Sequence, residues 1–128
     1  MATVSVRYIV NNVDETISFY TDKLGFSLNM HPAPTFAMLD KGDLRLLISA
    51  PSEQSGGGQI MPDGRIPEPG GWNRISLQVS DLNSTVETLK KKGAHFRNDI
   101  VHGVGGKQIL LEDPSGNPIE LFEPFQQK

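Results

Sequence analysis

The chain of 128 residues contains no cysteine, which excludes disulfides, zinc–thiolate sites and thiol catalysis. It has no apolar run long enough to span a membrane. No lysine- and arginine-rich block is interleaved with aromatic residues, and acids outnumber bases by 15 to 12, so nucleic acid is not an expected partner. The N-terminal stretch ATVSVRYIV is too short and too polar for a signal peptide. We therefore expect a soluble cytoplasmic protein.

The most informative stretch is a predicted β-hairpin that runs from Gln108 to Pro124. Its turn, residues 113–117, contains Pro114 and Gly116, which favour the backbone angles of a tight connection. On the returning strand, Glu120 stands between two apolar residues. Because a carboxylate among apolar neighbours is costly unless it is paired, hydrated or bound to a metal, Glu120 is the first functional candidate.

The first half of the chain predicts a strand, a helix and three further strands. Residues Val4 to Val10 alternate in the manner of a strand. Asn12 followed by Glu15 predicts the start of a helix, and Gly25 its end. The three strands that follow are predicted over Phe26–Met30, Thr35–Asp40 and Leu44–Ser49.

The second half predicts the same order of elements. A strand over Trp72–Ser80 is followed by a helix that Asp81 caps and Gly93 ends. Three more strands are predicted over Phe96–Val101, Lys107–Glu112 and Ile119–Phe122. Between the halves, residues 51–71 are rich in glycine and proline, which indicates a connecting loop that is either a plain linker or a lid over a pocket.

The two halves therefore repeat one pattern, strand–helix–strand–strand–strand. Residues 1–50 and 72–128 form two βαβββ modules of one structural domain, joined by the 51–71 loop. In each module we expect the helix to cover one face of a four-stranded sheet. The opposite faces are then left to enclose a ligand.

This duplication, with FYTDKLGF in the first half and LLEDPSGNPIELFEP in the second, resembles the vicinal oxygen chelate superfamily. That group includes glyoxalase I, bleomycin-resistance proteins, fosfomycin-resistance enzymes and extradiol dioxygenases. The resemblance implies an α+β, glyoxalase-like fold: two βαβββ modules with paired, cupped, four-stranded mixed sheets and one main helix each. It also implies a homodimer.

The resemblance further implies where a metal would bind, namely on the first and last strands of each module. Those positions here hold Ser5, Arg74, Glu120 and a residue close to Leu46, where a shift of one residue leads to Arg45 or Leu47. A guanidinium is always protonated and repels a divalent cation. We therefore expect no metal cofactor, and instead an ion pair between Arg74 and Glu120. The alternative is a divalent metal on Glu120 in a lyase, isomerase or dioxygenase, with Glu120 as metal ligand or general base.

A polar set is predicted on the concave sheet faces, and two of its members are cationic. The set is Ser5, Arg7, Arg74, Ser76, Gln78 and Glu120. It suits an anionic or polar small molecule, including an aromatic one, although a solvated sheet face has the same pattern. Trp72 is either a core anchor, which we favour, or an aromatic wall for a planar ligand. The predicted function is metal-free small-molecule binding of the sequestration type.

Overall fold

The computed structural model describes residues 4–53 and 57–125. The chain divides into two compact units. The first contains residues 1–70 together with the turn 114–117, and the second contains residues 71–113 and 118–128. Each unit has one helix and one mixed sheet. The predicted α+β architecture of two βαβββ modules is confirmed.

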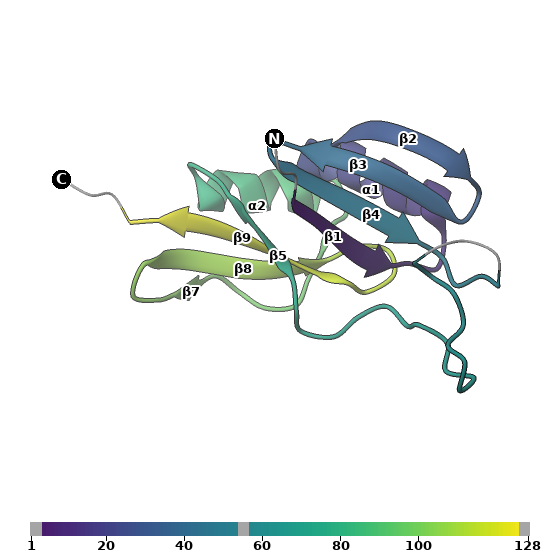
Figure 1. Ribbon diagram of the computed structural model, residues 1–128. Coiled ribbons are helices and arrows are strands. Elements are labelled where there is room, and N and C mark those ends of the chain that lie inside the picture. Colours follow the sequence, from purple (N-terminus) through teal and green to yellow (C-terminus); the bar gives the residue numbers. More distant parts are fainter. Residues whose placement is uncertain (1–3, 54–56, 126–128) are drawn as a thin grey trace. The chain divides into compact units, whose positions relative to one another are not determined.

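The first unit is a four-stranded sheet with the strand order β1-β4-β3-β2. Strand β1 is parallel to β4, whereas β4, β3 and β2 are antiparallel neighbours. Helix α1 covers one face of this sheet (Figure 1), where Tyr20, Leu39 and Leu46 are fully buried. The elements are β1 (Val4–Ile9), α1 (Val13–Leu24), β2 (Ser27–Ala33), β3 (Phe36–Lys41) and β4 (Leu44–Ser49).

Helix α1 begins and ends where the sequence predicts. The side-chain oxygen of Asn12 accepts a hydrogen bond from the backbone N–H of Glu15 at 2.9 Å, which satisfies a donor that the first turn leaves without a helical partner. Gly25 ends the helix with φ of 74°, an angle that favours glycine because it has no Cβ. Both predictions are confirmed, because capping depends on residues that are close in the sequence.

The second unit is a five-stranded sheet in which β5, β9, β8 and β6 are successive neighbours and β7 also pairs with β8. Helix α2 packs on one face through Leu82, Val86 and Leu89, which are buried (Figure 1). Asp81 caps this helix by accepting from the N–H of Ser84 at 3.1 Å, as predicted. The elements are β5 (Ile75–Gln78), α2 (Leu82–Lys91), β6 (His95–Phe96), β7 (Val101–His102), β8 (Gly106–Glu112) and β9 (Pro118–Pro124).

The prediction of one strand over Phe96–Val101 is wrong, since this stretch forms the two short strands β6 and β7. The side chain of Asn98 interrupts the ladder: its Oδ1 accepts the N–H of Leu110 at 2.9 Å. A side-chain amide thereby takes the place that a backbone carbonyl would have in a continuous strand. The second sheet consequently has five strands instead of the predicted four.

The segment between β4 and β5 is a loop, as predicted, in its described parts 50–53 and 57–71. It is ordered by backbone hydrogen bonds, such as Ser52 N–H to Gly58 O at 3.0 Å and Met61 N–H to Arg65 O at 2.8 Å. Among the described residues, no helix has both the length and the apolar character needed to cross a membrane.

Candidate functional site

Glu120 lies on the face of the second sheet opposite α2. In register, it is flanked by Ser76 on β5 and Leu110 on β8, and residues directly opposite each other on neighbouring strands share a face. The residues adjacent to Glu120 in sequence, Ile119 and Leu121, are buried on the helix-covered face. We call the face that carries Ser76, Glu120 and Leu110 the open face of the second sheet.

Both carboxylate oxygens of Glu120 have partners. The hydroxyl of Ser76 donates to Oε2 at 2.8 Å. Arg74 donates to Oε1 from Nη2 at 3.1 Å and from Nε at 3.3 Å. The predicted ion pair is confirmed, and its side chains are 28% exposed for Arg74 and 15% for Glu120. The pair neutralises the carboxylate and gives both of its oxygens hydrogen-bond partners at a partly exposed place on the sheet.

Arg74 is held by a third hydrogen bond, which runs from Nη1 to the backbone oxygen of Trp72 at 3.3 Å. Residue 74 immediately precedes β5, and its side chain reaches Glu120 on the open face. The guanidinium is therefore held from two sides, by Glu120 and by the backbone that precedes β5.

A second arginine, Arg97, contacts three groups of the same unit: Glu112, Gly71 and Trp72. Its Nε donates to Glu112 at 2.7 Å and its Nη1 to the backbone oxygen of Gly71 at 3.0 Å. The guanidinium also lies 4.9 Å from the centre of the Trp72 ring. These groups border a hollow of about 540 Å³, lined by Gly71, Trp72, His95, Phe96, Arg97 and Glu112.

The favoured prediction that Trp72 anchors the core is wrong, because its surface is 72% exposed. The ring packs against the cationic Arg97 instead of apolar core residues, an arrangement in which an aromatic face attracts positive charge. The exposed indole therefore agrees with the alternative that was left open, an aromatic wall.

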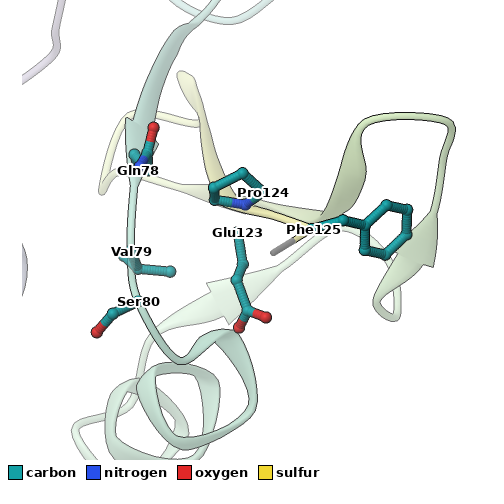
Figure 2. Close-up of a pocket in the computed structure, with 6 residues that line it drawn as sticks. All are labelled: Gln78, Val79, Ser80, Glu123, Pro124 and Phe125. Atoms are coloured by element: carbon teal, nitrogen blue, oxygen red, sulfur yellow. The ribbon is translucent and has the colours of Figure 1, made fainter. Parts of the chain in front are cut away.

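Gln78 lies on the same face as Ser76, two residues further along β5 and in register with Phe122. It borders a different hollow of about 390 Å³ (Figure 2), together with Val79, Ser80, Glu123, Pro124 and Phe125. In this hollow the carboxylate of Glu123 points toward helix α2 (Figure 2), where it accepts the N–H of Leu82 at 2.7 Å. That acid therefore stabilises the start of the helix.

Ser5 and Arg7 belong to the first unit, on β1. Both are exposed. The guanidinium carbon of Arg7 lies 5.8 Å from the centre of the Phe36 ring. The structure thus brings Trp72, Arg74, Ser76 and Glu120 together in the second unit, while Ser5 and Arg7 are side chains of the other unit.

The residues at the predicted metal positions do not fit a divalent ion. Leu46 is fully buried on the helix-covered face, in register with Val6, so the open face carries its neighbours Arg45 and Leu47 instead. Glu120 is already bonded to a guanidinium. Within the described residues, no cluster of three or more histidine and acidic side chains could hold a metal, and metals need several such donors at one point.

Sequence reasoning missed Arg97 and Glu112. Glu112 was assigned to a predicted strand without a role, and Arg97 lies 25 positions after Trp72 by their numbers in the sequence. Their charge alone did not mark them, because the predicted strands that contain them also carry other polar residues, such as Asn98 and Gln108. Their pairing depends on the β6–β8 register, in which His95 faces Glu112.

Two βαβββ units, each with a mixed sheet and one helix, define a protein of the glyoxalase-like fold. A model of the Glyoxalase/Bleomycin resistance protein/Dioxygenase superfamily matches residues 3–121. The chain belongs to this superfamily.

The similar proteins include ones with different roles. A probable chloroplastic lactoylglutathione lyase from Arabidopsis thaliana is 30% identical over 127 residues; the match covers 92% of this chain and 34% of the lyase. A superfamily member from Sphaerobacter thermophilus has a TM-score of 0.76 at 25% identity, covering 96% of this chain and 97% of its own. TnmS3, an antibiotic binding protein from Streptomyces sp. CB03234, has a TM-score of 0.72 at 20% identity, covering 97% and 96%.

Proposed function

We propose that this protein is a metal-free, small-molecule-binding member of the superfamily that acts by sequestration. The observation that carries this proposal is the state of Glu120, whose two oxygens are bonded to Arg74 and Ser76. A divalent ion at Glu120 would have to displace a guanidinium, or lie beside a positive charge that repels it. No second metal-binding side chain occupies the other three equivalent positions to offset that cost.

The proposed ligand is a polar or anionic compound with an aromatic part. Arginine side chains supply positive charge and hydrogen-bond donors, and the exposed ring of Trp72 supplies a flat surface for stacking. The proposed ligand-binding residues are Ser5 and Arg7 in the first unit and, separately, Trp72, Arg74, Ser76, Gln78 and Glu120 in the second. The antibiotic-binding protein TnmS3 supports this proposal, since its fold serves binding. We further propose that the protein is a cytoplasmic homodimer.

The second candidate function is a metal-dependent lyase, isomerase or dioxygenase with Glu120 as metal ligand or general base. The similarity to a probable lactoylglutathione lyase favours it, although this chain spans only about a third of that protein. The side chains around Glu120 argue against this second function, because the guanidinium of Arg74 would first have to leave the carboxylate.

The test combines metal analysis of the purified protein with thermal-shift measurements. We expect far less than one metal ion per chain and no shift with Zn²⁺, Ni²⁺ or Mn²⁺. A screen of small acids and aromatic antibiotics should raise the melting temperature with at least one compound, because a ligand specific to the folded state stabilises it.

Stoichiometric metal that is lost in Glu120→Gln would overturn the proposal. The matched control is Glu112→Gln, which removes a carboxylate from the same sheet at a position with no metal-binding counterpart. Metal lost in both variants would indicate a site other than the one that the superfamily uses.

A further inference from the structure

The open face of the first sheet is mainly apolar and carries two polar groups for which the described residues supply no ion-pair or hydrogen-bond partner. Register places Arg7, Leu47 and Met38 side by side across β1, β4 and β3. The next row consists of Ile9, Ser49 and Phe36. Because directly opposed residues share a face, all six side chains lie opposite the face that α1 covers. Ile9, Phe36, Met38 and Leu47 are only half-buried there.

Arg7 is a cation without an acidic partner. None of the ion pairs formed in residues 4–53 and 57–125 includes it. Its guanidinium lies near the Phe36 ring, 5.8 Å from the centre, and against the backbone of Gly57. A Cβ atom at Gly57 would collide with the guanidinium. An aromatic ring and a loop backbone thus hold this positive charge in place, which prepares it for an anion.

Ser49 provides the second polar group. Its side chain is fully buried, and its hydroxyl has no hydrogen-bond partner among the described residues. Buried hydroxyl groups are normally paired, so an unpaired one calls for an explanation. Ser49 is a diagonal neighbour of Arg7 in the β1–β4 register, and Gly58, the residue after Gly57, lies against its side chain. A Cβ atom added at Gly58 would lie 3.4 Å from Cβ of Ser49, so two consecutive loop residues lie close to the side chains of Arg7 and Ser49.

We infer that Arg7 and Ser49 bind the carboxylate of a small amphipathic molecule, with its apolar or aromatic part lying on Phe36, Met38 and Leu47. This inference rests on the proposed binding function and specifies its ligand class. A guanidinium and a hydroxyl both donate to a carboxylate, which accepts without donating. Methionine adapts its shape to flat or irregular apolar groups.

The same reasoning separates Arg7 from Arg74, although both were predicted to contact an anion. Arg74 is already neutralised by Glu120, so a ligand carboxylate would have to compete with a bonded carboxylate for it. Arg7 has no such competitor in the described part of the chain. The ligand carboxylate therefore binds to Arg7, whereas Arg74 holds the side chain of Glu120 in place.

The test is isothermal titration of the purified protein with 2-naphthoate and with the neutral isostere 2-naphthamide. We expect saturable, one-to-one binding of naphthoate and at least tenfold weaker binding of the amide. Arg7→Gln should lower naphthoate affinity at least tenfold. The matched control is Arg45→Gln, since Arg45 lies on the same face but already pairs with Asp40 at 3.3 Å. The naphthoate affinity of this variant should stay within twofold of the wild-type value.

Ser49→Ala separates a binding role from a structural one. The free variant should melt at the same temperature as the wild type or higher, because a buried, unpaired hydroxyl is removed. Its naphthoate affinity should nevertheless fall at least fivefold. If Ser49→Ala is stable and binds naphthoate with wild-type affinity, Ser49 does not contact the ligand carboxylate.

The loop contact is tested with a pair of glycine substitutions. Gly57 and Gly64 have nearly equal backbone φ, 88° and 91°, but nothing lies within 4 Å of a Cβ at Gly64, whereas a Cβ at Gly57 meets Arg7. Backbone strain is therefore matched in Gly57→Ala and Gly64→Ala. Only Gly57→Ala should weaken naphthoate binding.

Absence of naphthoate binding, equal affinity for the amide, or wild-type affinity in Arg7→Gln would overturn the inference. If a neutral compound binds to the metal-free protein instead, only the inference fails and the proposed function stands. Stoichiometric metal on Glu120 would overturn the proposed function, whatever Arg7 binds.

Discussion

The guanidinium carbon of Arg97 lies 4.9 Å from the centre of the Trp72 ring, so that a cation covers the only tryptophan of the chain. The same guanidinium bonds to Glu112 and to the backbone of Gly71. Trp72 is thus held by its neighbours at the surface, where a contact of this kind contributes about 0.5–1 kcal/mol. Its fluorescence reports directly on this arrangement.

Replacing Arg97 with alanine should free the Trp72 ring. We expect a larger acrylamide quenching constant for the tryptophan fluorescence, because the covering cation and its anchors are lost. The control is Arg65→Ala, which removes an exposed arginine that pairs with Asp63 and has no contact with Trp72 among those described. Equal quenching in Arg97→Ala and the wild type would show that the stacking does not restrain the ring.

Arg74→Ala should destabilise the fold by leaving Glu120 as a charge without its cation. The pair is intermediate between an exposed and a buried one, so we expect a loss of about 2 kcal/mol in the free energy of unfolding, measured with urea. Adding Glu120→Gln should recover part of the loss, since the unpaired charge is removed. A neutral result for Arg74→Ala would mean that Ser76 and water suffice for Glu120.

Gly106→Ala should destabilise the β8–β9 pair. A Cβ atom there would collide with the backbone oxygen of Glu123 and lie 2.9 Å from Cζ of Phe122 and from Cα of Pro124. Overpacking of this kind costs about 1–3 kcal/mol, to be measured by urea unfolding. Gly103→Ala is the control, because the nearest atom to its Cβ is 3.7 Å away. Equal stability of the two variants would contradict the expected clash.

Asn117→Ala should remove two hydrogen bonds of the first unit. The buried amide donates to the backbone oxygen of Ile9 at 2.8 Å and accepts the N–H of Gly70 at 2.7 Å. Leaving both backbone groups without this partner should cost about 2 kcal/mol or more, measured by thermal and urea unfolding. The control, Asn73→Ala, changes an exposed asparagine and should leave stability unchanged. Wild-type stability in Asn117→Ala would show that water replaces the amide.

Prediction from the sequence was most accurate where structure depends on near neighbours. Asn12 and Asp81 cap their helices as expected. Prediction failed where a distant partner decides: Asn98 bonds to Leu110 and breaks a strand. Leu46, named for the metal position on β4, lies on the helix-covered face, and only the alternatives one residue away, Arg45 and Leu47, lie on the open face, because a shift of one residue exchanges the two faces of a strand.

By itself, the sequence determined the duplicated βαβββ pattern, the helix caps and the residue types at the positions where the resemblance implies metal binding. These follow from side-chain periodicity, from short-range hydrogen bonding and from residue type, all of which are visible in one dimension. Only the tertiary structure decided that Trp72 is exposed and that, among the described residues, Arg7 forms no ion pair and the buried hydroxyl of Ser49 has no hydrogen-bond partner. Burial and pairing depend on residues brought from distant parts of the chain, so two arginines of the same predicted face acquired different chemistry.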